Sequence, residues 1–183
     1  MSEWLDRVRI RKMVEEDLPL IEWDGEYARY RKVYREVFRN QLIGLTTALI
    51  AESPDDGIVG QVFLTKKEPN PTFSPEDRYL FISSFRVKEP FRGRGLGTLM
   101  MKMAELIAQR EGLPLLILNC ARSNQAALTF YKDAGFEGFR LDDGYWRYID
   151  HEDRVRVESE PAFSLRKRVL CVNLKPVVKT VPE

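Results

Sequence analysis

Alternating and helical spacings of apolar positions predict the elements of the N-terminal third of the chain. Residues 7–13 alternate basic and apolar side chains, a period of two that is typical of a half-buried strand. A helix is predicted over residues 15–23, and Gly25 separates it from a second helix. The second helix has an apolar face that is expected to pack in the core: Tyr27, Tyr30, Tyr34, Val37, Phe38 and Leu42.

The middle of the chain reads as strands separated by a turn and a loop. Two apolar runs, 45–52 and 58–65, flank a Ser-Pro-Asp-Asp-Gly turn sequence and predict an antiparallel hairpin. Residues 66–78 contain three prolines, which predict a loop. Residues 79–87 form the next strand candidate.

Two further helices and a buried strand follow. The first helix has an apolar face and ends before Gly112, a residue suited to the position just past a helix end. The run 115–120 predicts a strand buried on both faces. Ser123 is the expected N-cap of the next helix, and Gly135 ends it. A strand, a helix and a strand in this order predict a parallel pair with a right-handed crossover.

The C-terminal part is less regular. Residues 136–149 predict one strand or a hairpin, and residues 169–174 predict a final strand. The stretch 151–168 is charged, and we expect it to be an irregular insertion. The whole pattern predicts one α/β domain over residues 1–183, with a mixed, mostly antiparallel sheet of about six to seven strands flanked by helices.

Composition excludes several classes of protein but does not identify a function. The 183 residues carry 29 Lys+Arg and 28 Asp+Glu, a net charge of +1, which argues against a protein that mainly coats nucleic acid or an anionic membrane. Two cysteines in apolar runs and a single histidine, His151, suggest no disulfide framework and no metal site. No signal peptide or membrane-spanning run is recognised, so the expected location is the cytoplasm.

The most informative segment is the glycine-rich run 92–98, which follows a strand and opens a helix. Glycines allow the backbone to approach a ligand closely, and the free amides of a helix N-terminus suit a phosphate. A flexible turn with solvent-facing arginines is the competing interpretation. The spacing lacks the Lys-Ser/Thr of a Walker loop and does not match G-x-G-x-x-G, so both nucleotide motifs fit poorly.

The glycine run also carries a family resemblance. Arg92-x-x-Gly95-x-Gly97 resembles the acyl-CoA pyrophosphate loop of the GCN5-related N-acetyltransferase (GNAT) superfamily. Two neighbouring patterns resemble the same superfamily: Phe85-x-Val87 before the loop and Asn124-x-x-Ala127-x-x-Phe130-Tyr131-x-x-x-Gly135-Phe136 after it. With the opening strand and helix, the resemblance covers about residues 7–136 and leaves 137–183 less certain.

The resemblance implies a role for each matching position. The cofactor expected is acetyl-CoA as co-substrate. Its pantetheine arm would lie against the main chain of Phe85 and Val87 and contact Asn124. Tyr131 would protonate the departing thiolate. The pyrophosphate would be bound by the amides of Arg92, Gly93, Arg94, Gly95, Leu96, Gly97 and Thr98.

The general base is not identified by sequence. Some members of the superfamily carry a glutamate five residues before the motif asparagine, and this chain has Asn119 there, which cannot act as a base. A water chain, an acceptor amine of low pKa or a carboxylate from a variable loop could replace it. The unranked carboxylate candidates are Glu26, Asp142, Asp143 and Asp150. A titrating role for His151 is less favoured than a solvated surface position.

The expected function is direct transfer of an acetyl group from acetyl-CoA to an amine in a ternary complex, without an acyl-enzyme. The acceptor would be a small-molecule or peptide amine, nucleic acid and membrane are not expected, and a homodimer is left open. The alternative is a non-catalytic acyl-CoA sensor on the same scaffold, which the base-less Asn119 favours. A nucleic-acid binder using the basic helix of residues 29–39 is disfavoured by the near-neutral charge.

Overall fold

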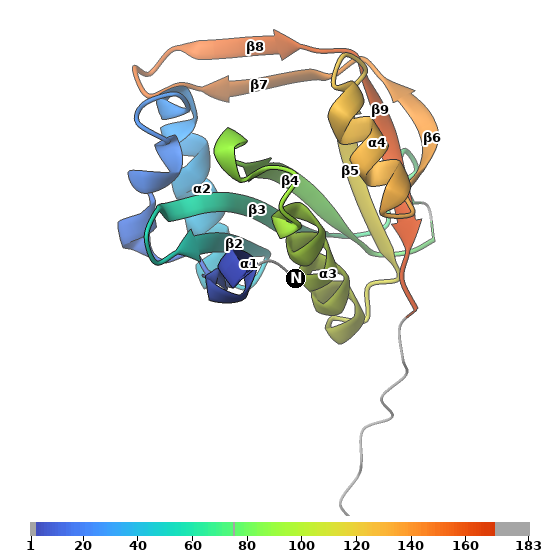
Figure 1. Ribbon diagram of the computed structural model, residues 1–183. Helices are drawn as coiled ribbons and strands as arrows, with labels where there is room; N and C mark the ends of the chain where they lie inside the picture. Colours follow the sequence, from blue (N-terminus) through green and yellow to red (C-terminus); the bar gives the residue numbers. More distant parts are fainter. Residues whose placement is uncertain (1–2, 75, 171–183) are drawn as a thin grey trace, which may run out of the picture.

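A seven-stranded mixed sheet forms the centre of the molecule (Figure 1). The structure is a computed structural model that describes residues 3–74 and 76–170. Across the sheet the strand order is β1-β2-β3-β4-β5-β9-β6, and only β4 and β5 run parallel. The strands are β1 (Arg9–Lys12), β2 (Thr46–Ser53), β3 (Gly57–Lys67), β4 (Tyr79–Val87), β5 (Leu115–Ala121), β6 (Glu137–Asp142) and β9 (Ala162–Arg168). The mostly antiparallel sheet and its one parallel pair confirm the fold class expected from the sequence.

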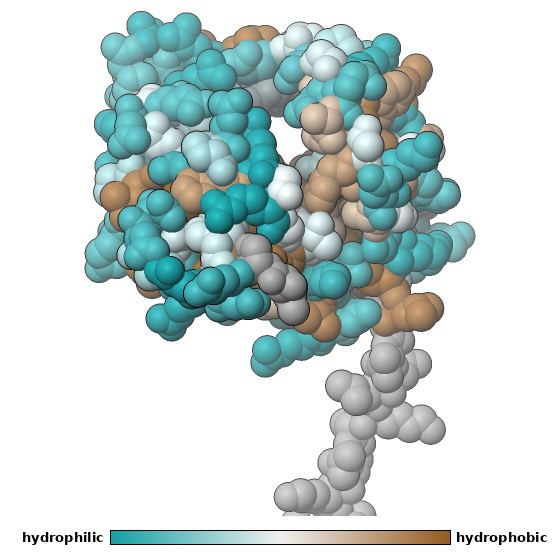
Figure 2. Space-filling model, in the orientation of Figure 1, coloured by the Kyte–Doolittle hydropathy of each residue, from teal (hydrophilic) through white to brown (hydrophobic). Residues whose placement is uncertain are grey.

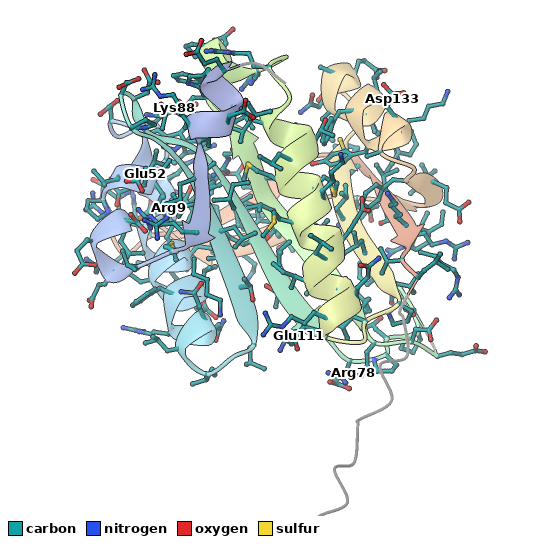
Figure 3. All side chains as sticks on the ribbon, turned by 60° about the horizontal axis from the view of Figure 1, so that its bottom comes forward. Arg9, Glu52, Arg78, Lys88, Glu111 and Asp133 are labelled. Atoms are coloured by element: carbon teal, nitrogen blue, oxygen red, sulfur yellow. The ribbon has the colours of Figure 1, made fainter. Side chains whose placement is uncertain are left out.

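Helices cover both faces of the sheet. On one face, α3 (Leu96–Arg110) lies along the strands between α1 (Glu3–Arg7) and α4 (Gln125–Asp133), with Glu111 beside its C-terminal end (Figure 3). On the opposite face, α2 (Arg31–Leu42) packs against β2. Four short 3-10 turns complete the helical elements of residues 3–74 and 76–170: η1 (Glu15–Asp17), η2 (Leu20–Glu22), η3 (Ala28–Tyr30) and η4 (Glu89–Phe91). Among the described residues, no helix has the length and apolar character needed to cross a bilayer.

A single extra residue in β4 decides which side chains face which helices. The register between β3 and β4 shifts between Gln61 and Phe63, and Ser84 in the bulge adopts a left-handed backbone with φ 48°. Before the bulge, Ile82 faces the α3 and α4 layer. A regular strand would turn Phe85 away from that layer, because successive side chains alternate between faces. The bulge instead places Phe85 and Val87 in the α3 and α4 layer and Arg86 on the opposite face.

The parallel pair β4 and β5 separates at its C-terminal end. Its pairing runs from Tyr79 opposite Leu115 to Ile82 opposite Leu118, and it extends no further along these two strands. β5 stays paired with β9 as far as Ala121. The main chain of β4 after Ile82 therefore lacks a partner on its β5 side, at the place where ligands bind in many sheets with parallel strands.

The C-terminal part differs most from the sequence prediction. Residues 151–168 are not an irregular insertion, because they contain β8 (Val155–Ser159) and all of β9. β8 pairs with β7 (Tyr145–Ile149) in a separate two-stranded sheet, the β7–β8 hairpin, whereas β6 pairs with β9. β8 is short and mostly exposed, with even Val155 and Val157 exposed, so no buried apolar run marks it in the sequence. The strand predicted at 169–174 is wrong at 169–170, and residues 171–174 lie outside the described residues.

Three smaller predictions also need correction. The helix expected over residues 15–23 is two 3-10 turns, which end where Trp23 takes a left-handed backbone with φ 47°. Asn124 rather than Ser123 caps α4, because its Oδ1 accepts a hydrogen bond from the Ala127 amide at 3.1 Å. Leu42 is 70% exposed at the end of α2 and does not pack in the core.

Candidate active site

The glycine run forms a tight turn that opens α3. Gly93 and Gly95 have φ of 70° and 89°, a left-handed conformation that favours glycine, and Gly95 is the N-cap of α3. The amides that follow have no partner within the helix and lie at the positive end of its dipole. Both arginine side chains of the turn have contacts of their own. Arg92 donates from Nε to the Val87 carbonyl at 3.0 Å, and the Arg94 guanidinium lies 4.0 Å from the centre of the Trp4 ring.

Aromatic contacts connect the loop with the other residues of the family motifs. A Cβ at Gly97 would lie 3.4 Å from the Phe130 ring, so the glycine allows α4 to pack closely against the start of α3. The Phe130 ring stacks on Phe85 of β4 at 5.7 Å. The ring of Tyr131 lies 6.2 Å from that of Phe85. The structure therefore brings the loop, the end of β4 and α4 together on one face of the sheet, as the motifs predict.

Tyr131 is buried at the centre of this group. Only 8% of its surface is exposed, and no hydrogen bond of its hydroxyl is found within residues 3–74 and 76–170. Burial raises the pKa of the phenol well above its ordinary value, and neighbouring Cys120 raises it further. The phenol is therefore protonated at neutral pH and can donate a hydrogen bond. Cys120 is buried in the same cluster, which agrees with a packing role.

A pocket of about 470 Å³ lies on the opposite face of the sheet, between α2, β4, β5 and the β7–β8 hairpin. We call it the hairpin pocket. Figure 2 shows the surface hollowed between its two flanks beneath the hairpin. The roof consists of stacked rings: Trp146 lies 4.6 Å from Tyr148 and 5.7 Å from Tyr30. Its floor reaches Ser83 and Ser84, where β4 separates from β5.

Few charged groups line the hairpin pocket. Asp142 is already engaged, because it accepts from the Gly144 amide at 2.8 Å and lies 3.6 Å from Arg140. Arg86 and Glu160 also line the pocket, and neither forms an ion pair among the residues that the structure describes. Asn119 lines the pocket from β5, and its Oδ1 accepts from Ser164 at 2.9 Å.

Glu160 is the carboxylate that sequence reasoning missed. It lies in the link between β8 and β9, and its amide donates to the Gly144 carbonyl at 3.3 Å. The next residue, Pro161, accepts from the Arg122 amide at 2.9 Å, which fixes this link beside the end of β5. The Glu160 carboxylate accepts from Ser123 Oγ at 3.5 Å and helps to raise the pKa of Cys120, so it lies near the β5 end. No local sequence signal distinguishes it from other surface glutamates.

The four carboxylates considered from sequence have other positions. Glu26 and Asp143 are exposed, and Asp142 is engaged as described. Asp150 is fully buried in the turn of the β7–β8 hairpin, where it accepts hydrogen bonds from the side chains of Arg154 and Arg156. The ligand atoms of Asp150, His151 and Glu152 lie within 4.8 Å of one another, but the arginines already satisfy the buried carboxylate.

Comparisons with known proteins agree with this arrangement. GCN5-related N-acetyltransferase 5, chloroplastic, of Arabidopsis thaliana is 31% identical over 112 residues, which cover 55% of this chain and 35% of that protein. The chain thus matches only about a third of the length of this curated relative.

Two solved structures share the fold. Arabidopsis thaliana NAA60 in complex with a bisubstrate analogue has a TM-score of 0.66 at 17% identity and covers 90% of this chain and 99% of that one. Spermidine N-acetyltransferase from Vibrio cholerae in complex with CoA and spermine has a TM-score of 0.63 at 14% identity and covers 89% and 96%. The profile of the acetyltransferase (GNAT) family matches residues 9–136. With this match over most of its length and the motif residues gathered on one face, the chain belongs to the acetyltransferase (GNAT) family.

Proposed function

We propose that the protein transfers an acetyl group from acetyl-CoA directly to an amine acceptor in a ternary complex. The observation that carries the proposal is the opening between β4 and β5, which lies between the glycine loop on one face of the sheet and the hairpin pocket on the other. A thioester placed in this opening could be reached by an amine from the opposite face. Such positioning supplies much of the rate of a two-substrate reaction.

Acetyl-CoA would bind on the α3 and α4 side. The amides from Gly95 to Thr98 would bind the pyrophosphate, and the unpaired main chain of Phe85 and Val87 would bind the pantetheine arm. The free side-chain amide of Asn124 is available to contact the same arm, because only its Oδ1 is used for the cap. The amides of Arg92, Gly93 and Arg94, also named from the sequence, would complete the pyrophosphate site.

The acceptor ammonium loses two protons on the way to an amide, and the departing thiolate gains one. We assign proton removal to Glu160, acting on the acceptor ammonium directly or through water. The amine lone pair then forms the C–N bond to the acetyl carbonyl carbon. As the C–S bond breaks, the nitrogen releases its second proton to water, and water restores the proton that Tyr131 gives up. The departing thiolate of CoA receives a hydrogen bond, and finally a proton, from the Tyr131 hydroxyl, which burial keeps protonated. No acyl-enzyme is formed.

A non-catalytic acyl-CoA sensor is the second candidate, and the amide of Asn119 at the position of a family base favours it. Calorimetry with acetyl-CoA, followed by a panel of amines assayed for free CoA, separates the two candidates. The enzyme predicts binding and CoA release that depends on the amine. Binding without release for any amine would support the sensor, and no binding would refute both.

The assignment of residues 1–183 to one acyltransferase domain and a cytoplasmic location complete the proposal. The single domain is supported by the seven-stranded sheet, which includes strands from β1 to β9. The location is supported by Cys120, which is a free, buried thiol.

A further inference from the structure

Arg86 in the hairpin pocket is fixed in position but not neutralised. Its Nη1 donates to the Tyr34 hydroxyl at 2.7 Å, and its guanidinium lies 4.0 Å from the centre of the Tyr27 ring. The side chain is partly buried. No carboxylate in the described part of the chain forms an ion pair with it. A cation that leaves water without a counter-ion is unfavourable, so this arginine is prepared to receive an anion.

Neighbouring cations on the same side of the sheet do have partners. Arg31 at the start of α2 binds Glu22 at 2.6 Å, and Lys32 binds Asp153 of the β7–β8 hairpin. The carboxylates of Glu22 and Asp153 therefore bind cations of α2 and not Arg86. Arg86 alone combines a pocket position, rings that fix its guanidinium and the lack of an ion-pair partner among the residues described.

A bulge in the β4 backbone determines where the Arg86 side chain lies. Arg86 faces the hairpin pocket only because of the bulge at Ser84, whose left-handed backbone is costly for a residue other than glycine. The same bulge turns Phe85 toward Tyr131. The bulge at Ser84 thus determines the side-chain positions on both faces of the sheet. It places the Arg86 guanidinium beside the β4–β5 opening.

The hairpin pocket also carries a negative charge that forms no ion pair among the residues described. Glu160 lines the pocket from the link between β8 and β9, Asp142 is already engaged, and Asn119, Ser83 and Ser84 add uncharged polar groups. A molecule with an anionic group and an ammonium group would find a charge of opposite sign for each, Arg86 on β4 and Glu160 on the link between β8 and β9. The aromatic roof of Tyr30 and Trp146 would cover the carbon atoms between them.

We propose that the acceptor is an amine that also carries a carboxylate, and that this carboxylate binds Arg86. The inference rests on the proposed function, because the ammonium end is the group that would be acetylated. A planar guanidinium suits a carboxylate especially well, because it can donate two parallel hydrogen bonds. A polyamine without an anionic group would bring a second cation toward Arg86 and would be disfavoured.

Direct binding tests the proposal before any turnover is required. Protein saturated with CoA is titrated with α-amino acids and ω-amino acids, each compared with its own carboxamide. We expect acids of the fitting length to bind at least about tenfold more tightly than their amides, as for a charge-assisted hydrogen bond in a pocket. The ratio of kcat/KM for acid over amide should show the same preference with acetyl-CoA as donor.

Three variants identify the residue responsible, and a fourth serves if the first does not fold. Arg86→Gln should remove the preference for the acid, and Arg86→Lys, which keeps the charge but loses the planar fork, should retain part of it. Arg35→Gln removes the same charge from an exposed position on α2 and should leave the preference unchanged. Near-UV circular dichroism and melting temperature establish that each variant is folded. If Arg86→Gln does not fold, Tyr34→Phe takes its place. It removes the hydroxyl that holds the Arg86 guanidinium and should weaken the preference for the acid.

Several outcomes would overturn the inference. Amides that bind wild-type protein as well as the acids would do so, and so would an acid preference that survives Arg86→Gln. Acetylation of simple amines, polyamines or peptides without a nearby carboxylate, in preference to the acids, would refute the inference and leave the proposed function intact. Failure to bind acetyl-CoA would instead refute the proposed function.

Discussion

The two faces of the sheet are built in different ways. On the α3 and α4 face, the candidate acetyl-CoA site consists mainly of backbone: a glycine turn, a helix N-terminus and the unpaired main chain of β4. On the opposite face, the hairpin pocket consists of side chains from α2, β4, β5 and the β7–β8 hairpin. A ligand common to a whole family can be bound by backbone, whereas an acceptor that varies is recognised by side chains that can change without altering the sheet.

The largest effect is expected at Tyr131, which is buried on the α3 and α4 face. Tyr131→Phe removes the only proposed proton donor to the thiolate, and kcat should fall by about 10²-fold or more while the affinity for acetyl-CoA is kept. The matched control is Tyr79→Phe, a buried tyrosine whose pKa burial also raises but which lies at the paired end of β4. Steady-state rates and calorimetry give the result. Equal kcat in the two variants would contradict the assignment.

Glu160→Gln should have the next largest effect. Removal of the base should lower kcat/KM about tenfold to a hundredfold at neutral pH. The loss should shrink as pH rises toward the pKa of the acceptor, about 10.4 for an alkylamine, because free amine then needs no base. The matched control is Glu158→Gln, which makes the same charge change two residues away. A deficit of the same size at every pH would show that Glu160 has another role.

The backbone side can be tested at Gly95. Gly95→Ala places a Cβ 3.1 Å from Leu5 in a left-handed turn, so acetyl-CoA affinity should fall about tenfold, equivalent to roughly 1.4 kcal/mol. Gly112→Ala is the control, since its φ of 65° is also left-handed but open space surrounds it at the far end of α3. Both variants should lose some stability. Calorimetry that finds equal acetyl-CoA affinity for both would refute the loop site.

The smallest effect is expected on the hairpin. Burial alone would raise the pKa of Asp150, but hydrogen bonds from the Arg154 amide and from two arginine side chains lower it to about 2. A lowered pKa stabilises the fold at pH values above the unfolded value of 3.8, and this stabilisation is lost as pH falls toward 2.

Asp150→Asn should therefore melt at a lower temperature than wild type at neutral pH, and the difference should narrow below pH 3.8. Thermal scans at several pH values measure it, with exposed Asp143→Asn as the control. The variant should weaken acceptor binding and leave acetyl-CoA affinity unchanged. A constant difference in melting temperature down to pH 2 would contradict the role of the charge.

Sequence reasoning succeeded where the signal is local. The glycine turn and the cluster around Tyr131 follow from short motifs, because the required backbone and helix positions lie a few residues apart. It failed where long-range pairing decides. Glu160 reaches the pocket only because β9 pairs with β5 and β6, and the facing of Arg86 depends on a one-residue bulge in β4. Neither pairing register nor bulge position is encoded in a recognisable spacing.

The central claim is that acetyl-CoA on one face and an amine on the other react within one complex. Initial rates measured while both substrates are varied test it most directly, once the amine panel has identified an acceptor. The proposed mechanism predicts double-reciprocal lines that intersect, and an intact protein mass that shows no acetyl adduct after acetyl-CoA alone. Parallel lines together with a covalent acetyl-protein would contradict it.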